Sequence, residues 1–102
     1  MMKLEILRKA ETDLKNIAYK HSQLSGVKSA RKITDKIRKS LELLKQSPYL
    51  GRICDEPPFL DEGYRRLICG NYLCLYKVDK DCVVVYHIVD GRTDYPKLFE
   101  TE

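Results

Sequence analysis

The sequence predicts a single α+β domain: a short N-terminal strand, an antiparallel helical hairpin and then a three-stranded antiparallel meander. Apolar residues recur at spacings of three and four between residues 10 and 44, which is typical of amphipathic helices. Three runs rich in β-branched and aromatic residues follow between residues 64 and 89, separated by short turn-forming connections. The length of 102 residues allows one modest core, so we expect residues 1–102 to form one domain.

The N-terminal segment from Lys3 to Leu7 is short and alternates weakly, which favours an edge strand that joins the later sheet. From Arg8 the apolar period becomes helical. We expect His21, near the end of this helix, to be a surface or capping residue, because nothing nearby supplies a second metal ligand. The apolar stripe of the helix holds Ala10, Leu14, Ile17 and Ala18, and His21 falls at the same spacing.

A second helix follows the turn signal Ser25-Gly26, and Ser25 is a candidate cap for it. Ser47-Pro48 ends this helix, because proline disfavours helical geometry in the residue before it. The two helices form a hairpin whose apolar stripes require a sheet as partner. The stripe of the second helix holds Val27, Ala30, Ile33, Ile37, Leu41 and Leu44.

Residues 49–63 are rich in Gly, Pro and acidic side chains, which predicts an ordered surface loop between the hairpin and the meander. In the meander, Gly70-Asn71 predicts a two-residue turn, and residues 79–81 predict a three-residue turn that pairs Val78 with Cys82. One face of this sheet would hold Arg65, Leu67, Cys69, Tyr72, Cys74, Tyr76, Val84, Tyr86 and Ile88. The other face would hold Tyr64, Arg66, Ile68, Leu73, Leu75, Lys77, Val83, Val85, His87 and Val89.

Both predicted faces of the sheet are largely apolar, whereas the free face of a small antiparallel sheet is usually polar. We therefore expect a protein partner to cover the face that the helices leave open. The charge of the chain is also unevenly divided. Residues 1–52 hold 13 Lys and Arg against 5 Asp and Glu, and residues 53–102 hold 6 against 10. The basic helical half is either a solvated surface or attractive to nucleic acid, the ribosome or an acidic protein.

The sequence contains no apolar run long enough to cross a bilayer and no signal-peptide pattern, so we expect a cytoplasmic protein with no membrane association. Its four cysteines form neither a CxxC pair nor a zinc-ligand spacing. We expect free cysteines packed as small apolar residues, with reactive or bridged thiols as the alternative. No metal site and no cofactor are expected.

The order of these elements, and three motifs, resemble the RelE/ParE superfamily of bacterial toxins. The motifs are AETDLKNIAY on the first helix, GYRRLICGNYLCLYKVD over the first hairpin of the meander, and VVVYHIVDGRTDY at its end. The resemblance implies the toxin of a type II toxin–antitoxin system, a growth inhibitor neutralised by a cognate antitoxin in a hetero-oligomer. It also implies one of two targets, since RelE-like members cleave mRNA on the ribosome and ParE-like members inhibit DNA gyrase.

A metal-free ribonuclease needs a base for the 2′-hydroxyl, cations for the phosphate and an acid for the leaving oxygen. In the RelE-like reading, His87 is the candidate base because its ordinary pKa lies near neutrality. Arg66 and Arg92 are candidate phosphate ligands, and Tyr95 is a candidate acid or stacking residue.

The ParE-like reading is favoured where this sequence departs from the RelE-like pattern. Leu73 stands where the resemblance implies a nuclease arginine, and a leucine cannot contact phosphate. The ending Gly91-Arg92-x-Asp94 is also closer to ParE-like members, and Asp94 is a candidate ion-pair partner of Arg92. We therefore expect a gyrase inhibitor that acts by binding, with the mRNA endonuclease and a degenerate antitoxin-binding member as alternatives. The candidate binding residues are Arg65, Arg66, Leu73 and Asp94.

Overall fold

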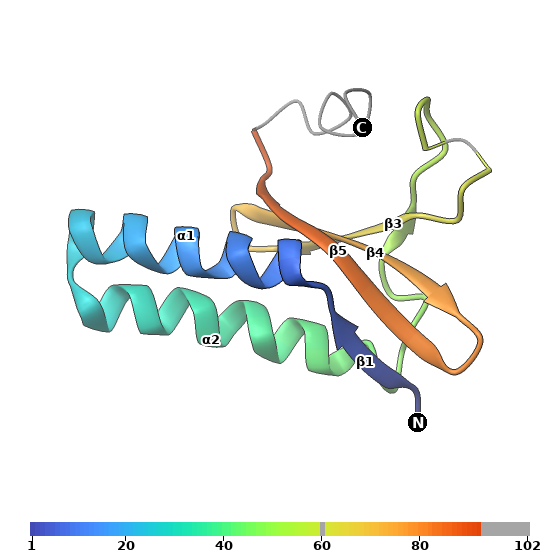
Figure 1. Ribbon diagram of the computed structural model, residues 1–102, viewed down its shortest axis with the longest axis horizontal. Helices are drawn as coiled ribbons and strands as arrows, with labels where there is room; N and C mark the ends of the chain where they lie inside the picture. Colours follow the sequence, from blue (N-terminus) through green and yellow to red (C-terminus); the bar gives the residue numbers. More distant parts are fainter. Residues whose placement is uncertain (60, 93–102) are drawn as a thin grey trace.

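A helical hairpin packed on one face of a five-stranded sheet makes up the fold (Figure 1). The computed structural model describes residues 1–59 and 61–92. The strands lie in the order β1-β5-β4-β3-β2, with β1 parallel to β5 and the other neighbours antiparallel. The elements are β1 (Lys3–Ile6), α1 (Arg8–Ser25), α2 (Val27–Leu43), β2 (Arg52–Ile53), β3 (Arg65–Cys69), β4 (Tyr72–Asp79) and β5 (Cys82–Asp90).

This architecture confirms the predicted α+β class, including the N-terminal edge strand. The short strand β2 was not predicted, because two residues are too few to show an alternating pattern. β2 pairs with β3 and extends the sheet beyond the meander. None of the helices in the described part of the chain is long and apolar enough to cross a membrane.

The two helices are joined by Gly26 alone, which has a φ of 89°. The Gly26 N–H donates to the Ser22 carbonyl at 3.0 Å and so closes α1. Ser25 is the last residue of α1, and α2 begins without a side-chain cap, so the predicted capping role of Ser25 was wrong. Gly26 joins the helices with a positive φ, which glycine adopts readily. It also occupies the N-cap position of α2, and glycine has no side chain that could cap the helix.

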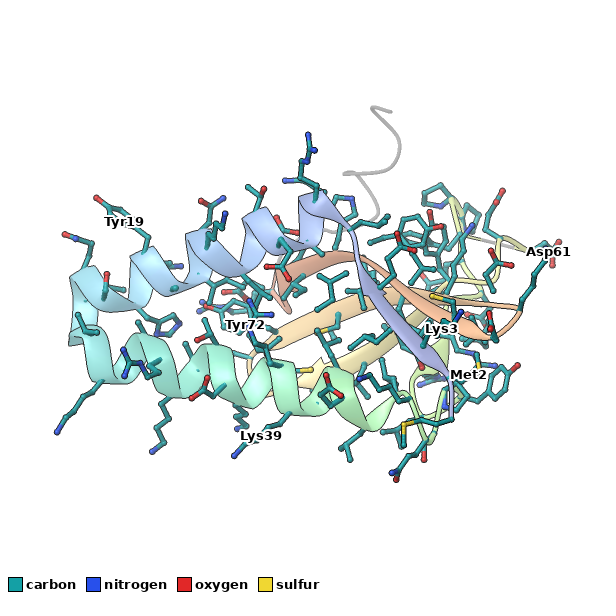
Figure 2. The ribbon with its side chains drawn as sticks, turned by 60° about the horizontal axis from the view of Figure 1, so that its bottom comes forward. Met2, Lys3, Tyr19, Lys39, Asp61 and Tyr72 are labelled. Carbon is teal, nitrogen blue, oxygen red and sulfur yellow. The ribbon has the colours of Figure 1, made fainter. Side chains whose placement is uncertain are left out.

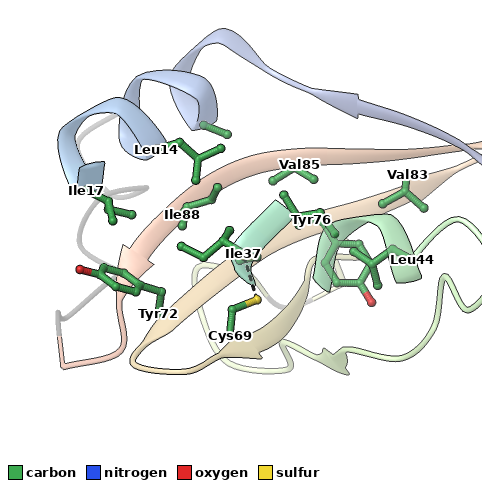
Figure 3. Packing of buried hydrophobic residues seen from close by; sticks show 13 residues of the cluster. Leu14, Ile17, Ile37, Leu44, Cys69, Tyr72, Tyr76, Val83, Val85 and Ile88 are labelled. Carbon is green, nitrogen blue, oxygen red and sulfur yellow. Dashed lines mark hydrogen bonds between the residues drawn. The ribbon is translucent and has the colours of Figure 1, made fainter. Parts of the chain in front are cut away.

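The core lies between the hairpin and the sheet (Figure 3). α1 and α2 contribute the stripes that the helical spacing predicts, and the sheet contributes alternate residues of β3, β4 and β5. The buried members of this cluster are Ala10, Leu14, Ile17, Ile37, Leu41, Leu44, Cys69, Tyr72, Cys74, Tyr76, Val83, Val85 and Ile88.

The predicted pairing of β3 with β4 is confirmed, but that of β4 with β5 was wrong by one residue near the turn and by two beyond the bulge, where Leu73 pairs with Val89 and not with His87. Lys80 has a φ of 56°, and the turn is a two-residue turn in which Asp79 pairs with Cys82. Val78 therefore pairs with Val83 instead of Cys82. A non-glycine residue seldom takes a positive φ, so the residue types of this turn did not indicate the shorter form.

The shorter turn changes which β5 residues face the helices. Val83 and Val85 lie in the core with Cys74 and Tyr76, whereas the predicted register placed Val84 and Tyr86 on the face of these two residues. A β-bulge opposite Leu75 and Tyr76 then shifts the register of β5 again, and Ile88 shares the face of Cys74 and Tyr76, as predicted.

The second face of the sheet is partly covered by the chain itself. Cys54, Phe59 and Leu75 form a second buried cluster, with Tyr64 packed against it. The rings of Phe59 and Tyr64 meet edge to face, with centroids 5.4 Å apart. The segment between β2 and β3 therefore covers part of the face that we expected a protein partner to cover. Another part of this face stays open, since Ile68 on β3 is 73% exposed.

Candidate functional site

An open depression of about 400 Å³ lies where the β3–β4 turn meets the end of β5. We call it the meander-end depression, and it is lined by Ile68, Asn71, Tyr72, Leu73, Gly91 and Arg92. Gly70, with a φ of 63°, forms the tight turn between β3 and β4. The Gly91 N–H donates to the Asn71 carbonyl at 2.8 Å and ties the end of β5 to that turn. Two predicted site residues, Leu73 and Arg92, thus meet at one surface.

Arg92 pairs with Asp90, two residues before it in the sequence. The Asp90 carboxylate accepts hydrogen bonds from the Arg92 backbone N–H at 2.9 Å and from its guanidinium at 3.2 and 3.1 Å. Asp94 and Tyr95 lie outside the described residues, so their predicted roles stay predictions. Paired with Asp90, the exposed Arg92 still offers a cation at the rim of the depression.

We expect Asp90 to titrate at an unusually low pH. Hydrogen bonds from the Arg92 side chain and backbone lower the Asp90 pKa from 3.8 to about 2. Because the folded pKa lies below the unfolded one, any stability from this pair is present above the ordinary carboxyl pKa and is lost as pH falls toward 2. NMR titration of Asp90 should show the low midpoint, and Arg92→Ala should return it toward 3.8. Lys20→Ala should move it less, and an equal shift in both variants would contradict the assignment.

His87, the candidate base, is buried at the edge of β5 and is only 6% exposed. β1 ends at Ile6, opposite Val85, so beyond Val85 the side of β5 that faces away from β4 has no strand beside it among the described residues. α1 takes that place, and the Asp13 carboxylate accepts the Ile88 N–H at 3.0 Å and lies 3.6 Å from His87 Nδ1. The imidazole is therefore packed against α1 and is not presented to the solvent.

The two arginines of β3 have different surroundings. Arg65 donates to the Gly51 carbonyl at 2.8 Å, and its guanidinium lies 4.9 Å from the centre of the Tyr49 ring. Arg66 is half-buried and pairs across the sheet with Leu75. Because Leu75 also pairs with His87, β4 separates the two residues by about 10 Å between Cα atoms. The nuclease role of Arg66, His87 and Arg92 stays a prediction.

Two polar contacts under the helices were not predicted from the sequence. Tyr72 Oη and His21 Nε2 are 2.9 Å apart, so His21 holds α1 to the start of β4. Its position four residues after Ile17 on the apolar stripe was the available signal. The Cys69 and Cys74 Sγ atoms are 3.3 Å apart, and the hydrogen bond from Cys74 lowers the pKa of the Cys69 thiol. All four cysteines are free, as expected.

In the described part of the chain, no group of three or more His, Cys, Asp and Glu could hold a metal ion. The meander-end depression and the exposed basic side chains of the hairpin are both open to solvent. Similarity to known proteins separates the possible classes.

Residues 4–95 match the family model described as the ParE toxin of the type II toxin–antitoxin system parDE. This chain is a ParE-family toxin. Membership explains the order of elements found above and implies a cognate antitoxin as partner. The family match supports neither the RelE-like ribonuclease nor the degenerate member that only binds its antitoxin.

Solved structures agree with the ParE assignment. A chromosomal ParDE toxin–antitoxin structure from P. aeruginosa matches with a TM-score of 0.77 and 26% identity, over 88% of this chain and 96% of that one. A copper-bound mutant toxin from Helicobacter pylori matches with a TM-score of 0.60, over 88% of this chain and 94% of that one, and at 12% identity it shows the fold alone. Among curated proteins, no sequence matches this chain.

Proposed function

We propose that this ParE-family toxin arrests growth in the cytoplasm by binding DNA gyrase and blocking supercoiling, without cutting RNA. The observation that supports binding over catalysis is the burial of His87, which lies against Asp13 at 6% exposure. A general base must reach the proton that it removes, directly or through one water. Leu73 adds to this reading, because it occupies the meander-end depression with an apolar side chain.

We further propose that the cognate antitoxin covers the meander-end depression in a toxin–antitoxin hetero-oligomer. Ile68, 73% exposed, is the most exposed large apolar side chain of the sheet in the described residues. It borders the depression together with the half-buried Leu73. An exposed apolar surface rimmed by an ion pair is typical of a protein-binding site.

A supercoiling assay tests the proposed activity. The purified chain, added to DNA gyrase and relaxed plasmid, should leave the plasmid relaxed, and prior addition of the antitoxin should restore supercoiling. The parallel measurement is primer extension on translated mRNA. Codon-phased cleavage that disappears in His87→Gln or Arg92→Ala, with normal gyrase activity, would replace the proposal with the endonuclease. If cells that express this chain without the antitoxin grow normally, the chain is not an active toxin, and only the alternative of a degenerate antitoxin-binding member stands.

A further inference from the structure

The half of the hairpin that lies furthest from the sheet, residues 18–34, projects past the strands (Figure 1). We call this segment the hairpin tip. α1 buries Leu14 and Ile17 in the main core, and α2 buries Ile37 and Leu41, all of them outside the tip. Within the tip only Ala30 is buried. Packing of the hairpin on the sheet therefore places little constraint on the outer residues of the tip.

Large apolar side chains are nevertheless exposed on the hairpin tip. Tyr19, Leu24 and Val27 are 68%, 72% and 68% exposed, and Tyr19 points away from the body of the molecule (Figure 2). Tyr19 and Val27 border a depression of about 330 Å³ between the two helices, which Ala18 and Ala30 also line. Single exposed apolar residues are ordinary on a protein surface, but several around one depression mark a contact surface.

The hairpin tip carries basic side chains and no acidic ones. Residues 18–34 contain four Lys and Arg and no Asp or Glu. Lys28, Arg31 and Lys32 line a second depression, of about 450 Å³, together with Val27, which also borders the first, and Asp35, the residue that follows the tip. Among the described residues these three cations have no ion pair within 4 Å, whereas Arg38, further along α2, pairs with Glu11 at 3.3 Å.

We propose that the hairpin tip is a second docking surface, separate from the meander-end depression, and that it takes an acidic segment of the protein that the toxin inhibits. The inference rests on the proposed function for the identity of that protein. An acidic segment would place carboxylates on Lys28, Arg31 and Lys32 and an apolar side chain between Tyr19 and Val27. The charge pairs then orient the bound segment and raise the rate of association, and the apolar contact supplies most of the affinity.

Nucleic acid fits the hairpin tip less well than an acidic protein. Phosphate binding requires the cations alone and gains nothing from Leu24 or Val27, because contacts to the backbone are electrostatic. A protein partner uses both features, since interface centres are apolar and their rims are charged. The two hypotheses differ in which partner the tip variants bind more weakly, gyrase or a DNA duplex.

The test compares two tip variants with two matched controls on the full chain. Val27→Asp removes the apolar contact and Lys32→Glu reverses a charge, both at exposed positions. A negative charge at the first residue of α2 also suits the helix dipole, so Val27→Asp should fold. Leu50→Asp and Lys39→Glu make the same changes at exposed positions outside the tip. Circular dichroism checks the fold of each variant.

Binding to purified gyrase, binding to the antitoxin and growth arrest are then measured. Each tip variant should weaken binding to gyrase and growth arrest by about tenfold or more, with both controls within about threefold of wild type. Ile68→Asp should do the reverse, with weaker antitoxin binding and retained gyrase binding. If the folded Val27→Asp variant binds gyrase like wild type, the tip proposal is wrong while the proposed function stands.

Other results identify other occupants or another target. Loss of antitoxin binding alone in the tip variants would place the antitoxin on the tip and overturn the proposal. Weaker binding of a DNA duplex in both tip variants, with gyrase binding unchanged, would make the tip an electrostatic nucleic-acid site. If the wild-type chain arrests growth without binding gyrase, the proposed target fails, and growth arrest by the tip variants then decides the tip proposal by itself.

Discussion

Replacing Gly51 with alanine is expected to lower the free energy of unfolding by about 2–4 kcal/mol. Gly51 is buried at the end of the segment that leads from α2 into β2. A Cβ atom there would lie 2.7 Å from Tyr76 Cε1 and Oη and 2.8 Å from the Arg66 carbonyl oxygen. Neither neighbour can move easily, because one is backbone in β3 and the other is a fully buried ring.

The Tyr76 hydroxyl explains why Gly51 comes so close. It accepts the Gly51 N–H at 2.8 Å and donates to the Pro48 carbonyl at 2.8 Å. Burial raises the pKa of the Tyr76 phenol, so the hydroxyl keeps the proton that it donates. Tyr76→Phe keeps the ring but leaves two backbone groups without this partner, and should cost about 2 kcal/mol.

Urea unfolding measures both effects. The control is Tyr49→Phe, which removes the same hydroxyl from a ring that is 65% exposed and should change the unfolding free energy by less than about 0.5 kcal/mol. Equal unfolding midpoints for Gly51→Ala, Tyr76→Phe and the control would show that the segment before β2 is not held by this contact.

Replacing Asp13 with alanine is expected to destabilise the fold by about 2 kcal/mol. The carboxylate is 13% exposed and accepts the backbone N–H of Ile88, a residue that is 2% exposed. Alanine would leave that N–H buried without its acceptor, at the point where β1 no longer pairs with β5. It would also remove the contacts of the carboxylate with Lys9 and His87.

Amide hydrogen exchange distinguishes this local role from general destabilisation. Exchange at Ile88 should become faster in Asp13→Ala than exchange at Val83, which stays paired with β4. Asp13→Asn keeps an oxygen acceptor and should lose less stability than Asp13→Ala. If Ile88 and Val83 change equally in Asp13→Ala, the carboxylate does not hold the edge of β5.

The sequence by itself determined the features that depend on near neighbours in the chain. The helical stripes predicted which faces of α1 and α2 are buried, because side chains three and four apart share one face. Gly70-Asn71 set the β3–β4 turn, and with it the pairing of Cys69 with Tyr72. The family pattern, spread over the whole chain, also indicated a toxin of the RelE/ParE superfamily, and the family match then assigned it to the ParE toxins.

Only the tertiary structure decided the features that depend on distant residues. Lys80 adopts a positive φ that its type does not favour, so the β4–β5 register followed from the packing of Val83 and Val85 under the helices. His87 is a chemically capable residue, but Asp13, far away in the sequence, takes the edge of β5 beside it. Local patterns specify which elements form, and contacts between elements decide which of their side chains remain open to a partner.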